Sequence, residues 1–140
     1  MVQAAIDYSF SRTITASDVQ PLFHQATWAI SRNDGEVERM LAGSVNIGAW
    51  DRNRLIGYAR VVTDNVYRAF LEDVVVDEAY RGQKIGEEMV RRLLERVAHV
   101  EDVILTTGEN RRAFYERLGF HAFEAVHMHS KQPDQPTATG

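Results

Sequence analysis

The hydrophobic pattern of the chain changes its period after residue 76, and this change restricts the possible folds more than any other feature. Three short apolar runs separated by polar turns precede it, over residues 44–50, 55–62 and 69–76. Such short connections favour antiparallel strands. Apolar residues then recur at helical spacing from Ile85 to Val97, and another apolar run follows at 103–105. A strand, a helix and a strand in this order indicate a parallel crossover, so the sequence predicts a mixed sheet.

Weaker patterns predict further elements on both sides of this unit. Residues 8–12 alternate in polarity as a half-buried strand does, and Ser17 with Gln20 forms a capping-box pattern that starts a helix near Ser17 and continues it toward Ile30. The other expected elements are a short helix around residues 37–41, a helix over about 111–118 capped by Gly119, and a final strand over 122–128. Together they predict an α/β fold with a mixed, mostly antiparallel sheet of about six or seven strands and about four helices.

The composition is typical of one globular domain without cysteine chemistry. The chain has 140 residues, no cysteine, and 16 Lys and Arg against 20 Asp and Glu, which gives a net charge of −4. This acidic balance disfavours nucleic-acid binding, and no apolar run approaches the roughly 18 residues of a membrane span. We therefore expect a cytoplasmic protein with a single domain over residues 1–129. The proline-containing stretch 130–140 is predicted to be a disordered tail.

The strongest local motif runs from Val74 through Arg81 to Gly86, where a buried strand passes through a loop into the amphipathic helix. Gly82 and Gly86 allow backbone amides to turn inward without a side chain in the way. Those amides, the positive end of the helix and the cations of Arg81 and Lys84 favour a phosphate group. The same residues would also suit a plain strand–helix connection with solvated charges, so the loop alone leaves both interpretations open.

A second motif reads Asn-Arg-Arg-Ala-Phe-Tyr-Glu-Arg-Leu-Gly-Phe over residues 110–120. It places Tyr115 in a short helix that follows a strand. A phenol near the ends of the strands can donate a proton to a leaving group. A half-buried core tyrosine would show the same pattern, so this motif alone does not decide between catalysis and packing.

Together, the two motifs resemble those of the GNAT acetyltransferase superfamily in spacing, order and structural context. The family's first signature (Arg or Gln, two residues, Gly, one residue, Gly or Ala) aligns with Arg81 to Gly86, and its second aligns with Tyr115-Glu-Arg-Leu-Gly-Phe120. The first signature glycine is Lys84 here; its amide is kept, so a phosphate cradle survives if the local φ need not be positive. The resemblance covers about residues 8–128 and implies a GNAT fold whose sheet splays between the strand before and the strand after the main helix.

The resemblance implies acetyl-coenzyme A as the cosubstrate. Its pyrophosphate would lie on the loop and helix start, at Arg81, Gly82, Gln83, Lys84, Ile85 and Gly86. Its pantetheine arm would pair with the backbone at Val74 and Val76, as an added strand where the sheet splays. Asn110 resembles a family asparagine that contacts the cosubstrate, although it lies two residues closer to the tyrosine than in the common pattern.

The chemistry that the resemblance implies is direct attack of an amine on the thioester, for which the amine must lose a proton. Glu72 and Asp73 lie on the strand that leads into the loop. Side-chain alternation would direct them to opposite faces, so at most one is expected to meet the substrate; either could instead be a salt-bridged strand residue. We expect Glu72 to be the base, directly or through water, and Tyr115 to protonate or hydrogen-bond the departing thiolate. A backbone amide near Val74 would polarise the thioester carbonyl.

The sequence gives little information about the acyl acceptor. By resemblance it would enter between the first two helices and the strand turns, near Trp28, Ser31, Arg32 and the turn Thr63–Tyr67. His127 and His129 could share a strand face, but no third ligand is evident and no metal site is predicted. Proteins of this family are often dimers, so a homodimer is a candidate state.

The leading hypothesis is therefore an N-acetyltransferase acting on a primary amine of a small molecule, a peptide or a protein. The alternative is a non-catalytic GNAT-fold module that binds acyl-coenzyme A as a sensor or assembly domain. A third hypothesis, a tRNA-directed acetyltransferase, is disfavoured by the acidic charge and by the lack of a basic stripe.

Overall fold

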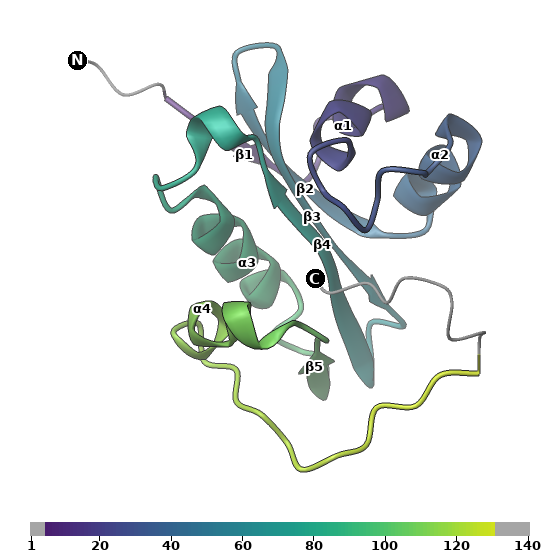
Figure 1. Cartoon of the computed structure of the whole chain (residues 1–140), viewed down its shortest axis with the longest axis vertical. Coiled ribbons are helices and arrows are strands. Elements are labelled where there is room, and N and C mark those ends of the chain that lie inside the picture. Colours follow the sequence, from purple (N-terminus) through teal and green to yellow (C-terminus); the bar gives the residue numbers. More distant parts are fainter. Residues whose placement is uncertain (1–4, 131–140) are drawn as a thin grey trace.

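A five-stranded sheet organises the chain in the computed structural model, which describes residues 5–130 (Figure 1). The strands are β1 (Asp7–Ser9), β2 (Val45–Asp51), β3 (Arg54–Thr63), β4 (Arg68–Val76) and β5 (Asp102–Ile104). They lie side by side in chain order, with antiparallel pairing from β1 to β4 and parallel pairing between β4 and β5. The predicted mixed, mostly antiparallel sheet is confirmed, with five strands in the described part rather than six or seven.

Helices cover both faces of this sheet. They are α1 (Ala16–Phe23), α2 (Asp34–Ala42), α3 (Ile85–Arg96) and α4 (Arg112–Glu116), with 3₁₀ turns η1 (Glu78–Tyr80) and η2 (Glu109–Arg111) ahead of α3 and α4. Figure 1 shows α1 and α2 on one side of the sheet and α3 and α4 on the other. No helix in the described residues is both long and apolar enough to cross a bilayer.

Two apolar cores hold these layers together, one on each face of the sheet. Met89 and Leu93 of α3 pack with Ile47 of β2 in one core, and Phe23 of α1 packs with Tyr58 of β3 in the other. All five side chains are fully buried. Burial of one such large apolar side chain contributes about 1.5–3 kcal/mol. β4 contributes to both cores, and this fixes its position between the two helical layers.

The first helix begins earlier and ends sooner than the sequence predicted. Thr15, not Ser17, caps α1: its hydroxyl accepts from the Asp18 amide at 3.2 Å, and the Asp18 carboxylate accepts from the Thr15 amide at 2.8 Å. After Phe23 the chain continues in tight turns, with Ala26 and Ala29 donating to carbonyls three residues earlier. The predicted continuation of the helix to Ile30 is therefore wrong, because these backbone hydrogen bonds span three residues, as in turns, instead of the four residues of an α-helix.

Both ends of the described chain depart from the predicted strands. β1 stops at Ser9 because the Ser9 hydroxyl accepts from the amides of Ser11 and Arg12 at 3.2 and 2.9 Å. The final strand over 122–128 is wrong: that segment has no regular structure, and Phe123 is 74% exposed. β5 spans only three residues, so it offers little backbone for another strand to pair with. The predicted tail at 130–140 lies outside the described residues except for Ser130.

Two glycine-to-alanine substitutions test the effect of core packing separately from the effect of helix propensity. A Cβ at Gly48 would lie 2.7 Å from the Trp50 Nε1 atom and 2.9 Å from the Leu55 Cδ1 atom, so Gly48→Ala should destabilise by about 1–3 kcal/mol. A Cβ at Gly35, in the first turn of α2, would meet nothing closer than 3.6 Å, so Gly35→Ala should stabilise by about 0.5–1 kcal/mol. Urea unfolding measures both, and effects of the same sign would contradict this account.

Candidate active site

β4 carries a bulge at Asp73, and the bulge decides which side chains meet. Tyr58 pairs with Val75 and Arg60 pairs with Glu72, so two residues of β4 face the single residue Ala59. Asp73 adopts the left-handed conformation, with φ +56°. The extra residue interrupts the alternation of side chains. As a result Asp73 joins the face that Glu72 and Arg60 share, and the prediction that the two acids point to opposite faces is wrong.

The carboxylate of Asp73 is buried and forms salt bridges with two arginines. Its carboxylate accepts from Arg32 at 2.9 and 3.1 Å and from the Arg60 Nε atom at 2.7 Å, while the Trp28 indole donates to it at 3.3 Å. The Asp73 side chain is 1% exposed, and those of Arg32 and Arg60 are 25% and 15% exposed. Arg32 and Trp28 come from the turns between α1 and α2, so this cluster ties those turns to β4.

The surroundings move the pKa values of the two acids in opposite directions. Burial alone would raise the pKa of Asp73, but hydrogen bonds and charges from Arg32 and Arg60 lower it to below its usual value. Burial and the negative charge of Asp73 raise the pKa of Glu72, against a smaller lowering by the same two arginines. Asp73 is therefore a fixed anion, whereas Glu72 is the half-buried carboxylate with an elevated affinity for protons.

Tyr115 comes to the same place from the other helical layer. It is 4% exposed, and its pKa is raised by burial, lowered by the charge of Arg111 and raised by the charge of Glu72. The charge of Glu72 therefore acts on Tyr115, which packs in the core on the α3 side of the sheet. The Tyr115 hydroxyl makes no hydrogen bond to any residue in the described part. The predicted cap of this helix is confirmed: Gly119 has φ +97°, and the Phe120 amide donates to the Tyr115 carbonyl at 3.1 Å.

One edge of β4 is free beside this site. β5 pairs only with Arg68, Ala69 and Phe70, whereas β3 pairs with β4 as far as Val76. From residue 71 to 76, β4 therefore has no strand on its second side within residues 5–130. The valines named from the sequence, Val74 and Val76, both lie on this free stretch. The Val76 carbonyl accepts from the Arg81 Nε atom at 3.1 Å.

The N-terminus of α3 is uncapped, unlike those of the two preceding helices. α1 and α2 each have a complete capping box, but no side chain caps α3. Among the described residues, no acceptor is found for the amides of residues 82–87. Gly82 has φ +81° and Lys84 has φ +62°. A lysine would fit here without strain only if the local φ were negative, and it is not. Lys84 adopts the left-handed conformation that favours glycine, at a cost of about 1–2 kcal/mol, and its backbone amide is still available.

The structure brings together some of the other residues named from the sequence and separates others. Trp28 and Arg32 reach the site through Asp73. Ser31 and Asn110 are exposed, and the turn Thr63–Tyr67 instead accepts hydrogen bonds from the amides of Glu101 and Asp102 at the start of β5. Two residues of the site were missed, Arg60 and Arg111. Hairpin register pairs Arg60 with Glu72, so counting back from the turn could have found Arg60.

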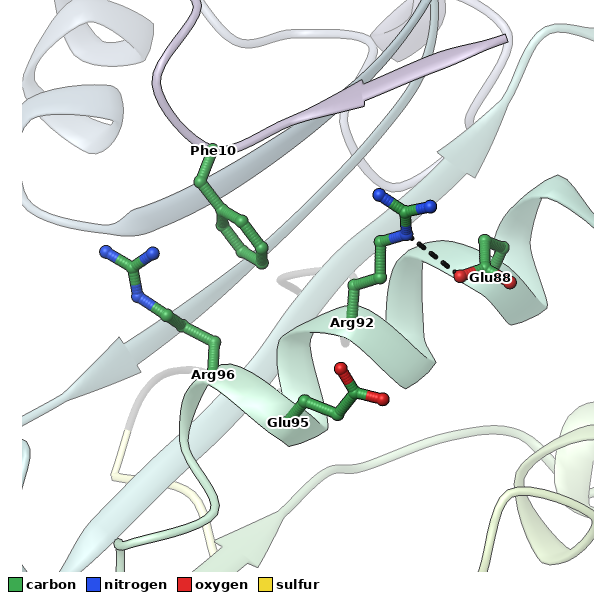
Figure 2. Close-up of a pocket in the computed structure, with 5 residues that line it drawn as sticks. All are labelled: Phe10, Glu88, Arg92, Glu95 and Arg96. Atoms are coloured by element: carbon green, nitrogen blue, oxygen red, sulfur yellow. Dashed lines mark hydrogen bonds and ion pairs between the residues drawn. The ribbon is translucent and has the colours of Figure 1, made fainter.

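A hollow of about 480 Å³ lies elsewhere, between α3 and the residue that follows β1 (Figure 2). It is lined by Phe10, Glu88, Arg92, Glu95 and Arg96. Figure 2 shows Arg92 bonded to Glu88, and the Arg96 guanidinium stacks on Phe10 with 4.9 Å to the ring centroid. These charges are already engaged, and the hollow contains none of the residues around Asp73.

Comparisons with known proteins identify relatives of this chain. The model of the acetyltransferase (GNAT) family matches residues 17–120. Over 76 residues the chain is 37% identical to the histone acetyltransferase TAP1 of Glycine max, covering 51% of this chain and 32% of that protein. It is 45% identical over 56 residues to glucosamine 6-phosphate N-acetyltransferase of Trypanosoma brucei brucei, covering 39% of this chain and 38% of that one. The chain therefore spans about a third of the length of these relatives.

A solved structure of a putative acetyltransferase from Xanthomonas campestris is similar over nearly the whole chain. Its TM-score is 0.79 at 20% identity, with 89% of this chain and 93% of that chain covered. The likeness at this identity concerns the fold.

Replacement of Asp73 tests the buried cluster. Asp73→Asn leaves two partly buried guanidiniums with a neutral partner, so it should lower the free energy of unfolding by about 3–5 kcal/mol at pH 7. Because the folded-state pKa of Asp73 is lowered, its stabilisation is present above the unfolded pKa of about 3.9 and is lost as the pH falls through the folded value. The difference from the native protein should therefore shrink in acid.

The control is Asp7→Asn, which removes a 3.7 Å pair with Arg12 between exposed side chains. Its effect should stay within about 0.5 kcal/mol. Urea unfolding at several pH values measures both variants, and equal losses would contradict a special role for Asp73.

Proposed function

The chain belongs to the GNAT acetyltransferase family, and from this premise we propose that it transfers an acetyl group from acetyl-coenzyme A to a primary amine. One observation supports the proposal most strongly: the charge of Glu72, on β4, acts on Tyr115, on α4, beside the stretch of β4 that β5 leaves unpaired. That edge leads directly into the uncapped start of α3. In this proposal a base, a phenol, a strand edge and a helix start that suits an anion act together.

The residues present suit acetyl-coenzyme A. The free amides of residues 82–87, at the positive end of a 12-residue helix, are donors for a pyrophosphate, and Arg81 and Lys84 add positive charge. No atom lies within 4 Å of the position that a Cβ would take at Gly82, so the approach to these amides is open. Val74 and Val76 would pair with the amide groups of the pantetheine arm, as an added strand would. For that pairing Arg81 would have to release the Val76 carbonyl.

The reaction needs a proton acceptor at the amine and a hydrogen-bond donor at the sulfur. When bound, the thioester supplies the acetyl group; the nitrogen–carbon bond forms and the carbon–sulfur bond breaks. Glu72 accepts the proton that the amine loses, directly or through a water molecule, and its raised pKa makes it a stronger base. A phenol is protonated at neutral pH, and the raised pKa of Tyr115 keeps it so, which leaves its hydroxyl free to donate toward the departing sulfur. Coenzyme A leaves as the thiol once a proton reaches it.

The relatives' names support an amine acceptor without selecting one. One is named for histones and another for glucosamine 6-phosphate, which are chemically different amines. The cytoplasmic location, the homodimer and the single domain over 1–129 stay predictions of the sequence. The alternative is a module that binds acyl-coenzyme A without turnover. For such a module, substitution of Glu72 or Tyr115 would change no rate of acetyl transfer.

Thermal unfolding tests the cosubstrate. Acetyl-coenzyme A and coenzyme A at about a hundred times the Kd should each add roughly 2.7 kcal/mol of stability, whereas ATP and NADH should add less. Arg81→Ala should weaken acetyl-coenzyme A binding by about tenfold, since a charge-assisted contact is lost. Arg91→Ala is the control, because Arg91 lies within α3, away from its N-terminus, and pairs with Glu87 and Glu88. No shift with the coenzyme A ligands would contradict the proposal.

Two conservative variants test the chemistry through release of free thiol. Glu72→Gln should lower kcat by about 10²–10⁴ and remove the acid limb of its pH profile. Since Glu72 must be ionised to accept a proton and its pKa is raised, kcat of the native enzyme should rise with pH through a value above the usual glutamate range. Tyr115→Phe should lower kcat while acetyl-coenzyme A binding is kept. Unchanged turnover in both variants would favour the non-catalytic module.

A further inference from the structure

On the face of β4 that carries Glu72, the guanidiniums of Arg32 and Arg60 share the single buried carboxylate of Asp73. Arg32 and Arg60 both bind Asp73, at 2.9 and 2.7 Å, and within the described residues neither forms a salt bridge to any other acid. The remaining contact of Arg60 is with the hydroxyl of Ser44 at 3.2 Å, which is neutral. One positive charge of this pair is therefore not balanced by Asp73.

Arg111 adds a third cation to the same place. Its guanidinium lies 5.9 Å from the ring of Trp28, the residue whose indole binds Asp73, and its charge acts on Tyr115. Arg111 is exposed and forms no salt bridge among residues 5–130. Its neighbour Arg112 differs, because it pairs with Glu109 and Glu116 at 3.2 and 3.4 Å.

The charges around Glu72 therefore do not cancel. Three guanidiniums, from Arg32, Arg60 and Arg111, stand against the carboxylates of Asp73 and Glu72, and the excess grows when Glu72 takes up a proton. A primary amine reaches the site mostly as an ammonium ion, which this excess repels. A second, negative group on the same molecule would reverse the repulsion. A guanidinium fork is also well suited to hold a carboxylate or phosphate.

From this balance we infer that the acyl acceptor is a primary amine that also carries an anionic group, a carboxylate or a phosphate, and that Arg111 binds that group. The inference rests on the proposed transfer to an amine and adds the chemical class of the acceptor. It disfavours polyamines and lysine-rich segments, whose additional cations would meet the same excess of positive charge. Arg32 and Arg60 contribute through their field, since Asp73 already occupies their forks.

Matched pairs of amines test the inference with the full chain and acetyl-coenzyme A. Ethanolamine is compared with phosphoethanolamine, and phenethylamine with phenylalanine; each pair differs only by phosphate or by carboxylate. The anionic member should have a kcat/KM at least about tenfold higher, chiefly through a lower KM. Which pair shows the larger ratio identifies the anion. Spermidine should be a poorer acceptor than either anionic amine, and added salt should reduce the ratios.

Substitution of the two neighbouring arginines assigns the effect to a residue. Arg111→Gln should remove most of the preference for the anionic member, and Arg111→Lys should restore part of it because the charge returns without the fork. Arg112→Gln is the matched control and should leave both ratios unchanged, since Arg112 pairs within its own helical turn. Equal loss in both glutamine variants would overturn the role of Arg111.

Binding is measured separately from turnover, so that failure of the inference can be told from failure of the proposed function. Calorimetry with coenzyme A present should show tighter binding of phosphoethanolamine than of ethanolamine, or of phenylalanine than of phenethylamine. Turnover of all amines without an anion preference would overturn the inference and leave acetyl transfer intact. Anion-selective binding without thiol release would retain the inferred ligand class and contradict the transfer reaction.

Discussion

One buried carboxylate holds the site together. Asp73 is 1% exposed, and an isolated carboxylate in that position would cost several kcal/mol. It is stable there because Arg32 and Arg60 bring guanidiniums to it from two other parts of the chain. The same contacts maintain its left-handed backbone, with φ +56°, and hence the bulge in β4. The turns after α1, the middle of β3 and the centre of β4 are thereby fixed relative to one another.

The other features of the site follow from where that bulge lies. The bulge begins one residue after Glu72, and β5 stops pairing with β4 at Phe70, two residues before Glu72. Glu72 therefore stands where the free edge of β4 begins, and a ligand that pairs with this edge would end beside it. The edge continues to Val76 and the loop that starts α3. Tyr115 belongs to α4 and packs in the core on the α3 side of the sheet.

The sequence predicts what depends on local pattern and misses what depends on distant partners. The strands β2 to β4 and the helix α3 follow from apolar spacing alone, and the Glu88–Arg92 pair forms at 2.9 Å as its spacing indicates. The bulge could not be predicted, because it depends on Arg32, 41 residues away. A spacing rule also could not choose between Thr15 and Ser17 as the cap, since both fit it. The expected strand over 122–128 contains apolar residues but has too short a partner in β5.

The arrangement of charges makes the base and the acceptor site interdependent. Glu72 has to be ionised before it can accept a proton, and it has to be basic enough to take one. Burial and Asp73 raise its pKa, which strengthens it as a base, whereas Arg60 and Arg32 lower it and keep it ionised. The same arginines supply the positive excess that would hold an anionic acceptor. A change that increased this excess would bind such an acceptor more tightly and weaken the base at the same time. Asp73 offsets part of both effects, so it sets the compromise between them.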